Sequence, residues 1–246
     1  MTTHNVLGRS LEGPFDVDGF SFWAMPNDGV LGKPGEDVKR IIESIVTEGQ
    51  TVVDVGAHVG YFTLLMAKLV GPGGKVFAFE PHPILNQALV KNVAANGFSD
   101  IVEIHEMALS DKTAEASLCM SPHNSGDNRL EGGDDDWDTV EVQTGCLDDF
   151  VKDVSFIKID TQGHDISVLR GARELIQRSP KITVCSEFWP EGMREAKIDV
   201  MEVVKEIRDL GFEIMLDGEI FSDDYARKLS EEPGIYKNLL YVKGEK

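Results

Sequence analysis

Four carboxylates follow the same pattern along the chain: each stands at the end of a predicted β-strand, at Asp54, Glu80, Asp160 and Glu187. The strands are short and apolar, and predicted helices separate them, which is typical of a mostly parallel sheet. The carboxyl ends of parallel strands meet at one edge, where open α/β sheets bind their ligands. One such acid could simply cap a helix. Four at one edge predict a binding or catalytic site.

The first acid belongs to the stretch TVVDVGAHVGYFTLLMA, at residues 51–67. A β-branched run is followed by a turn with Gly56 and Gly60 and then by a helical apolar pattern. This arrangement can bring backbone N–H groups and a helix N-terminus against a ligand, although the glycines could also serve only a tight turn. A dinucleotide fingerprint has a third glycine and seats a pyrophosphate. Here Asp54 precedes the turn, and an acid suits an ammonium group better than a phosphate.

Glu80 makes the expected ligand more specific. An acid after the second strand can accept hydrogen bonds from both hydroxyls of a ribose. S-adenosylmethionine carries a ribose and an ammonium group but no phosphate, so the pattern favours it over NAD. Two alternatives stay open: an NAD-linked Rossmann oxidoreductase and a non-catalytic module that only binds the cofactor.

The elements that must position these acids follow from hydrophobic periodicity. Asp18-Gly19 between alternating runs predicts a hairpin, and a helix is expected at 36–46. Residues 1–48 would then form a hairpin-and-helix unit, acting as a lid on the substrate side or as an edge of the core, before a cofactor-binding domain at 49–246. Within that domain we expect seven strands, at 51–55, 75–79, 101–105, 155–159, 182–185, 212–216 and 236–242. Helices are expected at about 62–69, 84–95, 165–176 and 199–210, and Gly171 could break the third of these.

A polar insertion at 121–138 interrupts this alternation, between strand-like segments at 116–120 and 139–144. Long polar loops in compact domains are often functional. We expect this loop to face the substrate. The side chains that could bind a hydroxylated acceptor are Asn124, Ser125, Asp127 and Arg129.

Six segments, taken in order, resemble the FkbM family of S-adenosylmethionine-dependent methyltransferases: VVDVGAHVGYFTLLMA, FAFEPHP, ALSD, NSGDNRL, FIKIDTQGHDISVLRGA and SEFWP. The resemblance spans roughly residues 51–218. It implies the α/β, Rossmann-like class I methyltransferase fold, with a seven-stranded, mostly parallel sheet, an antiparallel last strand and helices on both faces. It also implies contacts to S-adenosylmethionine from Asp54, Gly56, Ala57, His58, Gly60, Tyr61, Glu80, Pro81, Ala108, Ser110 and Asp160. The family commonly shows D-x-E-G-x-E after strand four, and this chain has Gln162 in place of the first Glu.

Methyl transfer to a hydroxyl requires an aligned acceptor and removal of its proton by a base or with the help of a metal ion. Asp160, His164 and Glu187 are the candidates for the catalytic group. Asp160 and Glu187 could also hold Mg²⁺, since such sites often use one or two carboxylates. The expected activity is O-methylation of a small metabolite, such as a sugar or polyketide, in natural product biosynthesis.

Composition limits the partners. Asp and Glu number 43 against 24 Lys and Arg, a net charge of -19 that disfavours nucleic acid and anionic lipid. The first residues lack a signal-peptide pattern, no apolar run is long enough to span a bilayer, and three scattered cysteines indicate reduced thiols. We therefore expect a cytoplasmic enzyme with a small-molecule acceptor, and a homo-oligomer is compatible with the sequence.

Overall fold

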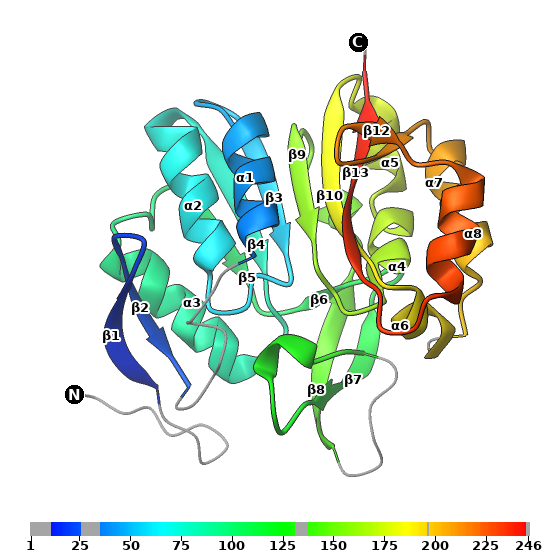
Figure 1. Cartoon of the computed structure of the whole chain (residues 1–246). Helices are drawn as coiled ribbons and strands as arrows, with labels where there is room; N and C mark the ends of the chain where they lie inside the picture. The colour runs from blue at the N-terminus through cyan, green and yellow to red at the C-terminus, as the bar shows by residue number, and fades with distance from the viewer. Residues whose placement is uncertain (1–10, 26–34, 131–136, 196, 245–246) are drawn as a thin grey trace.

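The central feature of the computed structural model is an eight-stranded sheet with the strand order β12-β11-β13-β10-β9-β3-β4-β5 (Figure 1). The structure describes residues 11–25, 35–130, 137–195 and 197–244, so the acidic run at 132–136 lies outside it. The strands of this sheet are β3 Thr51–Val55, β4 Lys75–Phe79, β5 Val102–His105, β9 Phe156–Ile159, β10 Ile182–Phe188, β11 Glu213–Leu216, β12 Glu219–Ile220 and β13 Lys237–Lys243.

The seven predicted strands are confirmed, together with the antiparallel last strand. β3, β4, β5, β9 and β10 pair in parallel, whereas β13 lies antiparallel between β10 and β11. The eighth strand, β12, is a two-residue edge strand that was not predicted. It pairs back on β11 because Asp217 and Gly218, with φ of 52° and 85°, form a tight turn between them.

Helices cover both faces, as predicted, and the strands β3, β4, β9 and β10 each contribute side chains to two cores. Val52 packs with α1, α2 and α3, while the next residue, Val53, packs with the helices on the other face. This explains why the strands are apolar throughout rather than alternating. The helices are α1 Glu36–Ile45, α2 Tyr61–Val70, α3 Pro83–Ala95, α4 Asp165–Arg170, α5 Arg173–Arg178, α6 Pro190–Glu195, α7 Val200–Asp209 and α8 Asp223–Glu231.

Two smaller sheets flank the central one. The predicted N-terminal hairpin is present as β1 Glu12–Val17 and β2 Phe20–Ala24, and it is tied to α3 by backbone hydrogen bonds with the amides of Asn92 and Asn96. The segments around the insertion form β7 Ala114–Met120 and β8 Asp138–Gly145, joined by β6 Ala108–Leu109.

One strand boundary differs from the prediction in a way that affects the site. β10 continues to Phe188 because its antiparallel pairing with β13 runs that far, so Glu187 lies inside the strand and not after it. The helix expected after Asp165 is divided at Gly171–Ala172 into α4 and α5, a break that the glycine had suggested. Helices α6 and α8 were not predicted.

Candidate active site

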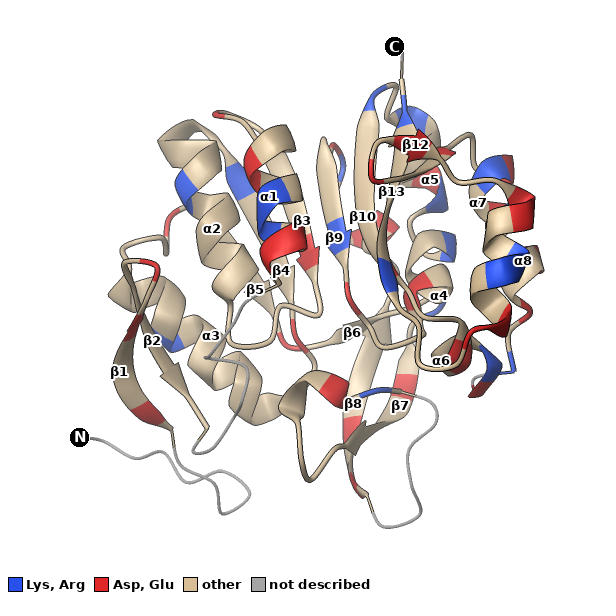
Figure 2. Ribbon diagram, in the orientation of Figure 1, with Lys and Arg blue, Asp and Glu red and all other residues tan. Residues whose placement is uncertain are grey.

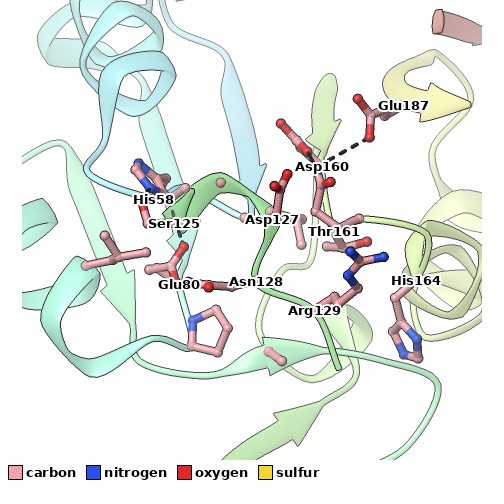
Figure 3. Close-up of a pocket in the computed structure, with 18 of the residues that line it drawn as sticks. His58, Glu80, Ser125, Asp127, Asn128, Arg129, Asp160, Thr161, His164 and Glu187 are labelled. Atoms are coloured by element: carbon pink, nitrogen blue, oxygen red, sulfur yellow. Dashed lines mark hydrogen bonds between the residues drawn. The ribbon is translucent and has the colours of Figure 1, made fainter. Parts of the chain in front are cut away.

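A cavity of about 930 Å³ lies at the carboxyl ends of β3, β4, β9 and β10 (Figure 3). The glycine turn, the residue after β4, the segment after β9 and part of the insertion form its walls. Its volume is at the upper end of the roughly 300–1,000 Å³ that is typical of small-molecule sites. Figure 2 colours the ribbon at charged positions, and such positions occur toward this end of β3 and β9.

The glycine turn approaches β9 too closely for any side chain at Gly56. A Cβ atom there would lie 2.0 Å from the backbone oxygen of Asp160, and φ is +72°. The backbone N–H groups of Gly56 and Ala57 both donate to Phe79 O at 3.0 Å, which fixes the turn against β4. The turn continues through left-handed conformations at His58 and Gly60. Glycine is therefore required at Gly56 by packing as well as by backbone conformation.

Glu80 is 5% exposed and lines the cavity next to this turn. Its Oε2 accepts the backbone N–H of His58 at 2.7 Å, and its Oε1 accepts that of His82 at 2.9 Å. Burial raises the pKa of Glu80 to about 7, although both backbone hydrogen bonds act in the opposite direction. Each carboxylate oxygen has a second lone pair, so Glu80 can still accept a hydrogen bond from a ligand.

Asp54 is fully buried and forms an ion pair with Lys158 of the neighbouring strand. Lys158 Nζ lies 3.2 Å from Asp54 Oδ1, and Thr63 Oγ1 donates to Asp54 Oδ2 at 2.6 Å. The lysine also donates to Gly56 O at 3.3 Å and lines the cavity. Burial alone would lower the pKa of Lys158, but the charges of Asp54 and Asp160 outweigh it and raise that pKa above its usual range. Lys158 therefore remains an ammonium ion.

Asp160 and Glu187 lie on the opposite side of the cavity, with Gln162 between them. Gln162 Nε2 donates to Asp160 Oδ1 at 2.9 Å and to Glu187 Oε2 at 3.4 Å. Lys158 Nζ is 3.7 Å from Asp160 Oδ2. Burial, followed by the charges of Asp160 and Asp165, raises the pKa of Glu187 to about 8. Glu187 is thus an unusually basic carboxyl group that faces the cavity.

The insertion closes one side of the cavity. Ser125 Oγ contacts His58 Nε2 at 2.6 Å, which joins the insertion to the glycine turn. Asn124 caps the short helix η3 Ser125–Asp127 by accepting the N–H of Gly126. Arg129 is paired with Glu195 at 2.8 Å, and its guanidinium lies over two tryptophan rings, Trp137 and Trp189.

Most of the side chains predicted from the sequence line this one cavity. They are Gly56, Ala57, His58, Tyr61, Glu80, Pro81, Ala108, Asn124, Ser125, Asp127, Arg129, Asp160, His164 and Glu187. Asp54, Gly60 and Ser110 are not among the lining residues. Ser110 Oγ lies 3.2 Å from His164 Nε2, so it adjoins the cavity through that histidine. Of the described residues before 48, Gly35 alone lines it, and the lid role of that segment stays a prediction.

Sequence reasoning missed Lys158. The only signal was a lysine in the middle of an otherwise apolar strand, SFIKI. A buried charge of this kind needs a paired partner. The register places Lys158 opposite Asp54 on the adjacent strand, and that partnership depends on which strands are neighbours.

The described residues do not support the predicted Mg²⁺ site. Within the described residues there is no group of three or more His, Cys, Asp or Glu side chains that could hold a metal ion. The group between Asp160 and Glu187 is the N–H₂ end of an amide, which donates hydrogen bonds, whereas Mg²⁺ requires oxygen ligands.

Comparison with known proteins identifies the family and the fold. The model of the methyltransferase FkbM domain matches residues 54–214, a range that contains the glycine turn, Glu80, Asp160 and Glu187. The chain belongs to the FkbM methyltransferase family. It is therefore an S-adenosylmethionine-dependent methyltransferase, and the NAD-linked alternative is set aside.

Among similar proteins, the methyltransferase sdnD of Sordaria araneosa is 24% identical over 207 residues, covering 70% of this chain and 77% of its own. Methyltransferase 1 of Beauveria bassiana is 27% identical over 144 residues, covering 49% and 57%. The chain spans less than two thirds of that second relative.

Solved structures share the fold. A methyltransferase from Aquifex aeolicus has a TM-score of 0.51 at 19% identity, covering 88% of this chain and 93% of its own. TYW2 of M. jannaschii, solved with AdoMet, has a TM-score of 0.53 at 15% identity, covering 96% and 85%. In the part of this FkbM chain that the structure describes, no helix has the length and apolar character needed to cross a membrane.

Proposed function

We propose that this enzyme transfers the methyl group to a hydroxyl of a small metabolite and that Glu187 removes the hydroxyl proton. The observation that carries the proposal is a basic carboxyl group, with a pKa of about 8, on the wall of the cavity beside Asp160. A general base is most effective when its pKa lies near the working pH. A carboxylate with an ordinary pKa is a weaker base than Glu187 and would take the hydroxyl proton less effectively.

The chain offers groups that fit the cofactor. Glu80 can accept hydrogen bonds from the ribose hydroxyls, and the Gly56 turn allows the backbone to approach the methionine portion. Ala108 lines the part of the cavity expected to lie beside the adenine. S-adenosylmethionine, when bound, supplies an electrophilic methyl group on a positively charged sulfur. Its net positive charge suits a cavity with several carboxylates.

Asp160 and Glu187 have different roles in this proposal. Both oxygens of Asp160 face a donor, Gln162 on one side and Lys158 on the other, so Asp160 is held in place. Within the described part of the chain, the side chain of Glu187 receives one hydrogen bond, the longer one from Gln162. Its carboxylate is therefore the more available of the two to orient the acceptor hydroxyl and to take its proton. His164 contacts Ser110 and lies nearer the expected adenine side.

The acceptor we propose is a small molecule. The cavity has room for a ligand beside the cofactor, and Asp127 and Trp189 of its wall combine a hydrogen-bond acceptor with an aromatic surface. A hydroxylated ring can use both. The net charge of -19 argues against nucleic acid as the acceptor.

The test is transfer of a radiolabelled methyl group from S-adenosylmethionine to a panel of hydroxylated metabolites and matched amines. We expect label in an ether product and a rate that rises with pH up to about 8. Glu187→Gln should lower kcat by at least about a hundredfold while cofactor affinity is retained, within the usual contribution of a general base. The surface variant Glu115→Gln is the control. Label found only on amines would contradict O-methylation.

A further inference from the structure

Gln162 occupies an unusual position between two carboxylates. One nitrogen, Nε2, donates to Asp160 Oδ1 at 2.9 Å and to Glu187 Oε2 at 3.4 Å, so its two hydrogens bond two acid side chains. An amide nitrogen is a donor with two N–H bonds and is well suited to this bridging geometry. The bridge joins two side chains at the adjacent carboxyl ends of the paired strands β9 and β10.

The backbone at Gln162 is held in a conformation that most side chains avoid. Its φ is +52°, and Gly163 follows with φ of +93°, packed against the backbone of Gly192. A left-handed conformation at a residue other than Gly, Asn or Asp is uncommon and often marks a functional site. Glycine would relieve the strain here but would also remove the amide.

The charged groups around Glu187 explain why a donor is needed between Glu187 and Asp160. The charges that act on Glu187 come from Asp160, Asp165 and Asp127, all negative, and from Lys158. The ammonium of Lys158 bonds Asp54 and Gly56 O and lies 3.7 Å from the other oxygen of Asp160, so on that side it faces Asp160 and does not bridge to Glu187. Two carboxylates held this close repel one another unless a donor or a cation lies between them.

We propose that Gln162 is a positioning residue that performs, without charge, the task of a cation between Asp160 and Glu187. It fixes both carboxylates on the acceptor side of the cavity and makes the enzyme independent of divalent metal. This inference rests on the proposed function only for the identity of the acceptor. It predicts that a carboxylate at the same position would complete a set of three oxygen ligands, the kind that Mg²⁺ and Mn²⁺ bind.

The experiment compares Mn²⁺ binding, followed by electron paramagnetic resonance with Mg²⁺ as competitor, in the native chain, Gln162→Glu and Gln143→Glu. Gln143 lies on the exposed surface of β8 and donates to Glu115 at 3.3 Å, so its substitution makes the same chemical change away from the cavity. Circular dichroism and calorimetric binding of S-adenosylhomocysteine verify that each variant is folded. We expect Gln162→Glu to bind one Mn²⁺ at least about tenfold more tightly than either of the other two proteins.

A second pair of variants tests the positioning role directly. Gln162→Asn keeps an amide and tolerates the left-handed backbone but is one methylene shorter, whereas Gln162→Met keeps the length and loses the donor. Both should bind the cofactor normally and lower kcat, with Gln162→Asn retaining more activity. Stoichiometric Mn²⁺ binding by the native chain, equal Mn²⁺ binding by Gln162→Glu and Gln143→Glu, or an unchanged kcat in Gln162→Met would each overturn the proposal. Since Mn²⁺ binding requires no methyl acceptor, failure of O-methylation would leave that result interpretable.

Discussion

Lys158 and Asp54 face each other across β9 and β3, with Nζ and Oδ1 3.2 Å apart and both side chains almost fully excluded from solvent. The pair lies directly beneath the glycine turn, since Lys158 also bonds Gly56 O. It therefore connects the expected methionine end of the cofactor to Asp160 on the acceptor side.

Removing one member of this pair should be costly. Lys158→Met leaves Asp54 as a buried, uncompensated carboxylate, and breaking a buried pair typically costs about 3–5 kcal/mol. Urea denaturation measures the loss, and Asp54→Asn combined with Lys158→Met should recover part of it.

Lys75 and Glu103, 3.2 Å apart on the exposed surface of β4 and β5, are the matched control. Lys75→Met should cost at most about 1 kcal/mol. An equal loss of unfolding free energy in Lys158→Met and Lys75→Met would show that water reaches the Lys158–Asp54 pair.

The sequence predicted the fold well because the strands and helices carry local signals. Apolar β-branched runs, Gly71-Pro72-Gly73-Gly74 and the Asn96-Gly97 helix end are all visible without a structure. The carboxylates at the ends of the strands were predicted for the same reason. The roles of Lys158 and Gln162 were not visible, because each depends on a neighbour brought near by strand order and not by sequence separation. Helix α8 was missed because its buried residues are just Ala226 and Leu229, so its sequence shows little of the apolar periodicity that predicts a helix.

Glu80 should make cofactor binding depend on pH. Its pKa is raised to about 7, and the ionised carboxylate accepts hydrogen bonds better than the protonated acid. S-adenosylmethionine affinity should therefore increase as pH rises from 6 to 8 and level off above that. Glu80→Gln should weaken binding by roughly tenfold to a hundredfold, the value of a hydrogen bond to a charged group, and should flatten this pH dependence. Calorimetry across that pH range is the measurement. An unchanged affinity in Glu80→Gln would exclude Glu80 as the ribose ligand.

Glu187 should destabilise the free enzyme at high pH. A carboxyl whose folded pKa is raised to about 8 binds its proton more tightly in the folded state than in the unfolded state. Its contribution to stability is therefore lost as pH rises from about 4.5 through 8. Glu187→Gln should be more stable than the native chain by about 2 kcal/mol at pH 9, less than the full conversion of the pKa shift because the carboxyl is partly exposed to solvent. The difference should disappear at pH 4 in paired denaturation curves, and a difference independent of pH would contradict the raised pKa.

Ser125 and His58 should control how fast the cofactor leaves. Their contact, 2.6 Å between Oγ and Nε2, joins the insertion to the glycine turn across one side of the cavity. Ser125→Ala loses the hydrogen bond with His58, worth about 0.5–1.5 kcal/mol, so S-adenosylhomocysteine should dissociate about 2- to 10-fold faster in stopped-flow displacement. Ser117→Ala, on exposed β7, is the control and should leave the rate unchanged. Equal dissociation rates for Ser125→Ala and the native chain would mean that the insertion does not retain the cofactor.

Substitution of Gly56 tests whether cofactor binding requires the close packing of the glycine turn against the end of β9. A second glycine, Gly49, separates this effect from the cost of the left-handed backbone. Alanine at Gly56 would place its Cβ 2.0 Å from Asp160 O, whereas alanine at Gly49 would meet nothing within 4 Å, although both have left-handed φ values of +72° and +81°. Gly49→Ala therefore measures the conformational penalty alone, about 1–2 kcal/mol. Gly56→Ala should cost clearly more, because the clash is with backbone and one of the two strands must shift. Calorimetry of S-adenosylhomocysteine should show binding retained in Gly49→Ala and lost in Gly56→Ala. If both variants kept binding and similar stability, the turn would have room to move, and the tight fit of the turn against Asp160 would not be needed for the cofactor.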